Sequence, residues 1–343
     1  SPGVCCRMFS SRRADMLDAH RPPEMLRSPL DDVFLHATLL LTRRGAADVH
    51  AARYLAKAPD PPEERSVQNA ESLLREIGAL AGGGELTALG VHLSALPLSP
   101  QFAKIVMWAT LFGVIESALT IVSALQYSDP FVSIGDGERM GSLADANKAI
   151  RNVKKGLCSP DCSDHIALLR ATELFAAAKA RGGDGAARQF CENHSLSFNK
   201  MQNVLRTRTK LRDELKKRGM SAESAGRNDG DTALLSAALC VGLFPNLALR
   251  PGGAGGKMKV VGGRLEAWPH SSSVTDRGGA KGRSELDAWC AAAPAQVDDL
   301  GRAAGESTTC WLGFNELSQV EDHYSLSGLT PVPLSAILLF CGV

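Results

Sequence analysis

One predicted helix, residues 197–218, carries a positive charge where a hydrophobic residue is expected. Its apolar residues repeat at helical spacing, and they are Met201, Val204, Leu211 and Leu215. The remaining position of this stripe is Arg208. Because an unpaired buried cation is costly, Arg208 either pairs with a carboxylate of the protein or faces a channel that accepts phosphate.

Two groups of basic residues add to this signal. The first occupies the flanks of the same helix, against only Asp213 and Glu214: Lys200, Arg206, Lys210, Arg212, Lys216, Lys217 and Arg218. The second lies further back along the chain: Lys148, Arg151, Lys154 and Lys155. Each group fits a solvated basic face or a contact with nucleic-acid phosphate, and the pattern leaves both open.

A third candidate is the sequence HSSSV at residues 270–274, here named the serine turn, which follows a predicted strand ending at Trp268. Hydroxyls and backbone amides in a tight turn are good donors to phosphate oxygens, independent of base sequence. A serine-rich segment can equally be a plain turn. Trp268 could stack on a base, although a place in the core is the expected role of a tryptophan here.

No catalytic motif accompanies these groups. The sequence has no G-x-x-x-x-G-K-[ST] loop, and GAGGK at 253–257 lacks the spacing and the following Ser or Thr, so a hairpin turn is expected there. The acidic letters at 321–323 receive no role. Cys158, Cys162 and His165 lie close together, but a fourth ligand at suitable spacing is missing, which favours a loop over a zinc site.

Composition limits the class of protein. The chain has 343 residues, 44% hydrophobic and 22% charged, which is typical of a globular protein with two or three domains. The net charge is +1, so any nucleic-acid surface must be a local patch. Nine scattered cysteines favour reduced thiols in an intracellular protein. A start without Met and without a signal peptide suggests an excised or incompletely predicted fragment.

Residues 3–10 read as a short buried strand. Ser28, Ser66 and Thr87 are the expected N-caps of three short helices before residue 98, which suit a winged-helix module or another small bundle. The apolar run 105–125 has the length of a membrane span, but Glu116 at its centre favours two buried helices broken near Gly113, with Ser117 as a cap.

From residue 101 to 219 the pattern is almost wholly helical. Ser163 or Asp164 can cap a helix that Gly182-Gly183 ends, and the basic helix follows. Beyond residue 231 a short helix, two strands joined by Gly262-Gly263 and a strand at 311–314 indicate a small barrel, ending in a helix at 333–340. A Gly/Ala/Ser-rich stretch at about 276–310 reads as a flexible insertion.

Several segments, in order, resemble the C-terminal half of DEAH/RHA-family RNA helicases. PGVCCRMFS resembles the segment after the sixth helicase motif, and PPEMLRSPLDDVFLHATLLL, YLAKAPDPPEE and AESLLREIGAL resemble the winged-helix region. Residues 86–131, CSDHIALL and RQFCENHSLSFNKMQNVLRTRTKL are similar to the helicase-associated helical region. ALLSAALCVGLFPNLAL, HSSSV and TPVPLSAILLF are similar to the oligonucleotide-binding (OB) fold.

The resemblance implies a mainly α, multidomain chain with a C-terminal β-barrel. The expected parts are the end of a RecA-like domain (1–27), a winged helix (28–98), a helical ratchet domain (99–225) and an OB-fold domain (226–343). The chain would close a channel over single-stranded RNA, or DNA. His270, Ser272 and Ser273 would contact the backbone, Arg208 and Asn199 would lie near the strand, and Lys200, Lys154 and Lys155 are added as basic candidates.

The motor is expected elsewhere. The chain lacks the Walker, DExH and arginine-finger motifs, so it should not hydrolyse ATP alone and needs no cofactor, whereas the parent helicase would use ATP and Mg²⁺. Its implied partners are its own RecA-like domains and a G-patch or other protein cofactor, with no membrane. The alternative is a non-catalytic adaptor, derived from a helicase tail, that binds RNA or protein.

Overall fold

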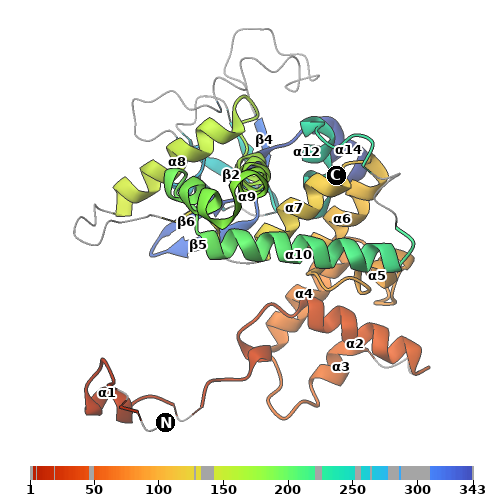
Figure 1. The fold of residues 1–343 in the computed structure, drawn as a ribbon. Helices are drawn as coiled ribbons and strands as arrows, with labels where there is room; N and C mark the ends of the chain where they lie inside the picture. Colours follow the sequence, from red (N-terminus) through yellow and green to blue (C-terminus); the bar gives the residue numbers. More distant parts are fainter. Residues whose placement is uncertain are drawn as a thin grey trace.

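The computed structural model describes residues 3–4, 6–18, 20–45, 50–126, 129–132, 143–220, 226–251, 256–262, 265–276, 286 and 310–341. The chain is mainly helical, with one mixed sheet in its C-terminal part (Figure 1). Its first elements are a helix α1 (Ser11–Asp15) and a 3-10 turn η1 (Glu24–Leu26). The strand predicted at 3–10 is wrong: its described residues form no strand, and Met8 is 97% exposed. A lone strand without a neighbour has nothing to satisfy its backbone.

Four helices form the next unit, below the main body in Figure 1: α2 (Asp31–Arg43), α3 (Ala51–Leu55), α4 (Glu64–Glu76) and α5 (Ala88–Leu93). Phe34, Leu35 and Leu74 are buried between them. Thr87 caps α5 as predicted, since its Oγ1 accepts the Gly90 amide at 3.0 Å. Ser28 and Ser66 do not cap: α2 starts three residues after Ser28, and Ser66 lies inside α4. Acidic residues in both first turns supply the favourable charge instead.

The apolar run forms two helices, α6 (Pro100–Phe112) and α7 (Ile115–Leu125), as predicted. Gly113 separates them with φ of 77°, a conformation that glycine adopts without strain. The predicted cap Ser117 is wrong, because the Asp229 carboxylate accepts the Glu116 and Ser117 amides at 3.3 and 3.1 Å. Among the described residues, no helix combines the length and apolarity that crossing a bilayer requires.

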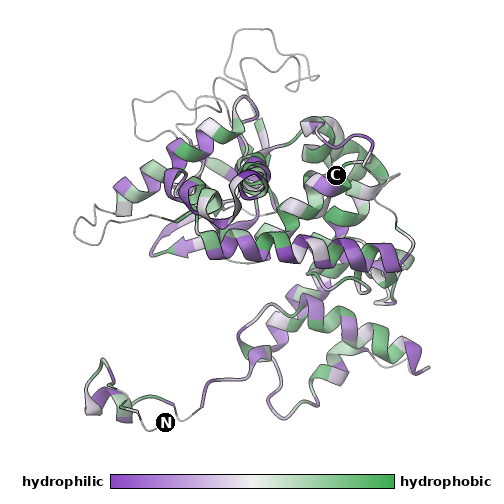
Figure 2. Cartoon of the chain, viewed as in Figure 1, coloured by the Kyte–Doolittle hydropathy of each residue, from purple (hydrophilic) through white to green (hydrophobic). Residues whose placement is uncertain are grey.

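Three longer helices follow, α8 (Leu143–Cys158), α9 (Asp164–Asn193) and α10 (Phe198–Lys217). Ser163 caps α9 through the Ile166 amide at 3.1 Å, as predicted. The predicted break at Gly182-Gly183 is confirmed: both glycines leave the helical conformation, Gly183 with φ of 65°, and a second helical segment, which was not predicted, follows the kink to Asn193. Figure 2 shows hydrophilic and hydrophobic residues alternating along α10, the basic helix.

The sheet has the strand order β5-β6-β3-β2-β1-β4-β7. The strands are β1 (Leu247–Arg250), β2 (Met258–Val260), β3 (Glu266–Pro269), β4 (Cys310–Gly313), β5 (Glu316–Val320), β6 (His323–Ser327) and β7 (Thr330–Pro331). Only β3 and β6 pair in parallel among these seven. The β2–β3 hairpin is confirmed, as is a reversal between β1 and β2 around 253–257, most of which lies outside the described residues.

The predicted closed barrel is not what the described strands form, because β5 and β7 are unpaired with one another at the two edges. The β5–β6 hairpin was missed, and residues 321–323 lie at its turn. Trp268 is 42% exposed, so the expected core position is wrong: it lies on the open face of a short strand. Nearly all of the predicted insertion at 276–310 lies outside the described residues.

Helix α12 (Thr232–Leu243) joins the sheet to the helical part by packing along α6, and α14 (Leu334–Phe340) packs on α12. The approach of α12 to α6 is closest at Gly242. A Cβ there would lie 2.1 Å from Ile105 Cγ1 and 2.7 Å from the Ile105 amide nitrogen. Since a backbone atom cannot be displaced without moving α6, only glycine fits this position.

We therefore expect Gly242→Ala to lower the free energy of unfolding by about 3 kcal/mol, as overpacking of a core does. Gly185→Ala is the matched control, because a Cβ at this helical glycine meets nothing within 4 Å. The control should be neutral or slightly stabilising. Urea unfolding followed by circular dichroism measures both, and equal stability of the two variants would contradict the close approach.

Candidate nucleic-acid interface

The described structure has a cavity of about 190 Å³ where the helical part meets the sheet. Its wall comes from the end of α7, the segment 129–131, helices α8 and α9, the serine turn and the β5–β6 hairpin. The polar groups that line it include Lys154, Asp164, His165, His270, Ser272 and Ser273. Four of the eight residues predicted from the sequence therefore lie together: Lys154, His270, Ser272 and Ser273.

The serine turn is held by its own hydrogen bonds. The Ser273 amide donates to the His270 carbonyl at 2.8 Å, which closes the turn. The Ser272 amide donates to His270 Nδ1 at 3.2 Å, and the Ser272 hydroxyl lies 2.8 Å from the same nitrogen. Because Nδ1 accepts from an amide, the proton of a neutral His270 ring is on Nε2. Ser272 and His270 are half-buried and border the cavity.

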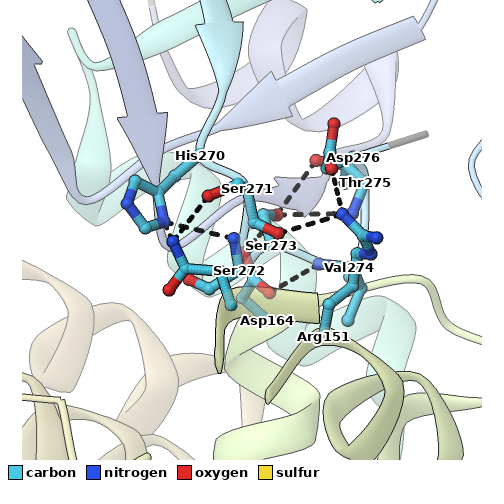
Figure 3. Close-up of polar contacts among 10 residues, drawn as sticks. Arg151, Asp164, His270, Ser271, Ser272, Ser273, Val274, Thr275 and Asp276 are labelled. Carbon is cyan, nitrogen blue, oxygen red and sulfur yellow. Dashed lines mark hydrogen bonds and ion pairs between the residues drawn. The ribbon is translucent and has the colours of Figure 1, made fainter. Parts of the chain in front are cut away.

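Asp164, the first residue of α9, anchors the turn (Figure 3). Its carboxylate accepts from the Ser273 hydroxyl at 2.6 Å, the Val274 amide at 3.0 Å and, from the sheet side, the Leu329 amide at 3.0 Å. Ser273 is 1% exposed. Its hydroxyl hydrogen is therefore used inside the protein, which makes Ser273 the least available of the predicted phosphate donors.

Helix α8 fixes the opposite end of the turn, and Figure 3 shows Arg151 reaching it. The Arg151 guanidinium donates to the Ser271 carbonyl at 3.0 Å and forms an ion pair with Asp276. Asn147 donates to the Ser271 hydroxyl at 2.7 Å. The turn is thus connected to α8 and α9 at the same time, and its shape depends on both helices.

Lys154 is the buried cation of the cavity. Its side chain is 7% exposed, its Nζ lies 3.2 Å from Asp129 Oδ2, and it sits 4.9 Å from the centre of the Phe131 ring. Burial opposes its charge, but the carboxylates of Asp164 and Asp129 outweigh burial and raise the pKa of Lys154. Lys154 is therefore protonated at neutral pH. Its neighbour Lys155 is half-buried on α8 and does not border the cavity.

Helix α10 lies apart from the cavity lining. Arg208 pairs with Glu116 of α7 at 3.4 Å, and Arg212 donates to the same carboxylate at 2.8 Å through Nε. Of the two alternatives for Arg208, internal pairing is therefore present, although its side chain is still 25% exposed. Asn199 is exposed in the first turn, and Lys200 donates to the Asp129 carbonyl at 2.8 Å. Lys200 thus connects α10 to the rim of the cavity.

His165 is the buried histidine behind the cavity, 1% exposed. Its Nδ1 is hydrogen-bonded to the Thr330 hydroxyl, which lies 2.8 Å from the Ser163 hydroxyl. Burial lowers the pKa of His165 to about 4, the positive charge of Lys154 acts in the same direction, and Asp164 opposes both. His165 is neutral at pH 7. Among the described residues, no three side chains that could ligate a metal form a cluster, and Cys158 and Cys162 are buried.

Sequence reasoning missed Asp164 and Asp129 as parts of this site. The sequence SDH at 163–165 predicted the start of a helix. It did not indicate that the carboxylate of Asp164 reaches the serine turn, 110 residues away. Asp129 lies in the segment 86–131, which the resemblance identified without giving this residue a role. Helix capping explains Ser163 locally, whereas the role of its neighbour depends on tertiary contacts.

Comparison with known proteins identifies two domains of the chain. Residues 99–231 match the family model "Helicase associated domain (HA2), ratchet-like", and residues 70–98 match "Helicase associated domain (HA2), winged-helix". DExH-box ATP-dependent RNA helicase DExH6 of Arabidopsis thaliana is 32% identical over 71% of this chain and 18% of its own length. ATP-dependent DNA/RNA helicase DHX36 of Rattus norvegicus is 32% identical over 76% of this chain and 25% of its own length.

The chain therefore contains the two helicase-associated domains, and its homologues are DExH/DEAH-box RNA helicases. It spans only about a fifth to a quarter of the length of these relatives, 18% and 25% in the two cases.

Asp164→Asn should lower the free energy of unfolding by about 2 kcal/mol. The amide has one oxygen to accept from the three donors, and it lacks the negative charge that strengthens these hydrogen bonds. Asp184→Asn is the control: this exposed carboxylate pairs only with Lys179, at 3.2 Å on the surface, and its loss should change little. Chemical denaturation measures both. Equal effects would show that the Asp164 contacts do not stabilise the junction.

The buried neutral His165 makes stability depend on pH. Its folded pKa, about 4, lies below the ordinary 6.5, so the unfolded chain binds the extra proton first as the solution is acidified. The stabilisation is complete above pH 6.5 and falls as pH drops toward 4, by about 2 kcal/mol between pH 7 and 5. Denaturation curves of the wild type and of His165→Gln measure this difference. The exposed His36→Gln variant should keep the wild-type dependence, and a parallel loss in all three proteins would contradict the assignment.

Proposed function

Because the chain contains helicase-associated winged-helix and ratchet-like domains, we propose that it is the RNA-binding C-terminal portion of an ATP-dependent RNA helicase. It would close a channel over single-stranded nucleic acid. The observation that carries the proposal is the junction cavity, where Lys154, His270 and Ser272 face a common space. Such donors bind phosphate oxygens without reading bases.

The buried charge of Lys154 is the group of the junction that would attract a polyanion, and the carboxylates of Asp129, Asp164 and Glu316 line the same cavity. Lys154 keeps its proton in a buried position, and a backbone phosphate at the mouth of the cavity would meet that charge with little screening by solvent. The Nε2 of His270 is a further donor on the same wall, and the half-buried hydroxyl of Ser272 would join it by turning from His270 Nδ1 to a phosphate oxygen. The carboxylates of Asp164 and Asp129 are both engaged by donors of the protein, which limits their repulsion of the strand.

Two further features support a strand that passes over this region. Trp268, immediately before the serine turn, exposes 42% of its surface and offers a stacking face for a base. Along α10 the exposed cations Arg206, Lys210 and Lys216 extend the positive surface, and Arg208 and Arg212 share the single carboxylate of Glu116. We assign the mixed sheet to a divergent OB fold. Its seven described strands and the position of the serine turn after β3 support this assignment.

The motor domains complete the proposal. ATP and Mg²⁺ would be bound by RecA-like domains of the same protein, and the chain described here would transmit their movement to the strand. A G-patch or another protein would regulate that coupling. The names of the relatives support the dependence on ATP. The RecA-like domains, Mg²⁺ and the protein regulator follow from the family resemblance, and the site of action would be the nucleus or the cytoplasm.

A protein-binding adaptor is the second candidate. One observation favours it: Leu111 on α6 and Leu338 and Leu339 on α14 are 73%, 59% and 72% exposed. Apolar side chains of this size on neighbouring helices are often covered by a partner. In that case the chain would bind protein and be indifferent to RNA.

Fluorescence anisotropy with a labelled single-stranded RNA separates the two. We expect residues 1–343 to bind with an affinity that falls steeply as salt rises, because bound phosphates release counterions. Ser272→Ala and Arg208→Ala should each weaken binding by about 5-fold, equivalent to about 1 kcal/mol. A DNA strand of the same sequence measures the preference between the two nucleic acids.

Ser318→Ala on β5 and Arg75→Ala on α4 are the matched controls, since Ser318 bonds only Ser325 in its own hairpin and Arg75 pairs with Glu71 on α4. Both should bind like the wild type. Binding that is insensitive to salt, or lost equally in controls and test variants, would overturn the interface. ATP turnover by this chain alone would overturn the assignment of the motor to other domains.

A further inference from the structure

Two cysteines far apart in sequence meet beside α6. Cys240 lies in the last turn of α12, and Cys341 is the residue that ends α14. Their Sγ atoms are 4.0 Å apart, although 101 positions separate them in the chain. They belong to the small apolar cluster that holds α14 against α12, which also contains Leu247 and Ile337. None of the residues proposed to bind nucleic acid is part of this cluster.

The two thiols differ in access. Cys240 is fully buried, while Cys341 is half-exposed at the end of a short helix. A reagent from solution therefore meets the Cys341 sulfur first, with the Cys240 sulfur directly behind it. This order resembles that of a reactive thiol and a resolving thiol.

The surroundings favour the charged form of the outer thiol. The hydrogen bond between the two thiols lowers the pKa of Cys341 although burial opposes this, and Lys104 on α6 lowers it further. Hydrogen bonding to Cys341 and burial raise the pKa of Cys240. By contrast, burial raises the pKa of the Cys158 and Cys191 thiols to about 11. Thiolate character, which controls reaction with oxidants, therefore favours this pair of thiols over the isolated buried cysteines.

We propose that Cys240 and Cys341 form an oxidative modification site, at which a peroxide converts the facing thiols into a reversible disulfide between α12 and α14.

The chemistry balances with a peroxide as the oxidant. The Cys341 thiolate attacks one peroxide oxygen and breaks the O–O bond, which gives a sulfenic acid and releases hydroxide, protonated to water. The Cys240 sulfur then attacks the sulfenic sulfur, loses its proton, and releases a second water as the S–S bond forms. Two thiols are oxidised by two electrons and one peroxide is reduced to two waters. A small dithiol such as dithiothreitol returns both cysteines to thiols by exchange.

The geometry permits closure. The sulfurs must approach by about 2 Å to reach a bond length of about 2.05 Å. Cys341 follows the last turn of a seven-residue helix, so its side chain and the helix end can supply this movement while Cys240 stays in the core. The resulting covalent loop encloses the whole sheet, β1 to β7, and fastens it to α12.

The test uses the full chain of 343 residues, treated with hydrogen peroxide and then alkylated without reductant. Peptide mass spectrometry should find a Cys240–Cys341 cross-linked peptide in most molecules, two mass units below the sum of the reduced peptides, that dithiothreitol removes. The oxidised chain should melt about 5 °C or more above the reduced one, because the bond restricts a long loop of the unfolded chain.

Cys240→Ser and Cys341→Ser should each abolish the cross-link and the rise in melting temperature. Cys191→Ser, at a buried cysteine on α9, is the matched control and should retain both. Should a variant fail to fold, the wild-type peptide map alone decides. Sulfinic acid at Cys341 without the cross-linked peptide, equal alkylation of both thiols after peroxide, or a cross-link through other cysteines would each overturn the proposal.

Discussion

The carboxylate of Asp164 is the interaction on which the arrangement of helices and sheet depends. It begins α9, and it accepts one hydroxyl and two amides from two separate parts of the C-terminal region, the serine turn and the residue before β7. A buried charge is tolerated only when donors surround it, and here the helix N-terminus and the ammonium of Lys154 add to the three hydrogen bonds. The helical part and the sheet are therefore joined by polar contacts of fixed direction as well as by the apolar contact of α12 with α6. A polar junction of this kind sets the orientation of the turn in a way that apolar packing alone cannot.

Much of the helical fold could be predicted because its signals are local. Thr87, Ser163 and Gly113 mark helix ends through their own hydrogen bonds or backbone angle, and periodicity located α10 correctly. The failures share a cause. Ser28 and Ser66 were plausible caps that acidic first turns made unnecessary, and the cap of α7 comes from Asp229, 112 residues further on. Individual strands of the sheet could be predicted from local patterns. The order of the strands and the closure of the sheet depend on pairings between distant residues, so the sequence did not show that the predicted barrel is an open sheet.

The candidate site shows the same division. Serines after a strand were recognisable as donors, and Arg208 was recognisable as an anomaly in an apolar stripe. The sequence could not decide whether Arg208 pairs with a carboxylate of the protein or faces a channel. The structure decides for pairing, because Glu116 faces Arg208 across the contact between α7 and α10. In the sequence, Lys154 is one of four basic residues at 148–155 that look alike. The fold shows that, of these four, Lys154 lines the cavity and Arg151 hydrogen-bonds the serine turn. The sequence identified the chemistry of the site, whereas its geometry came from contacts between segments that are far apart in the chain, such as Asp164 and the serine turn.

The clamped serine turn also bears on how this region can change in evolution. The connection from β3 to β4 leaves the turn at Asp276, which Arg151 holds, and re-enters the sheet at Cys310, which pairs with Arg250 of β1. Both ends are fixed by the rest of the protein, and the entropy of closing a loop grows only slowly with its length. Residues can therefore be gained or lost between these two anchors, as by a shifted splice boundary, while the turn before them keeps its shape.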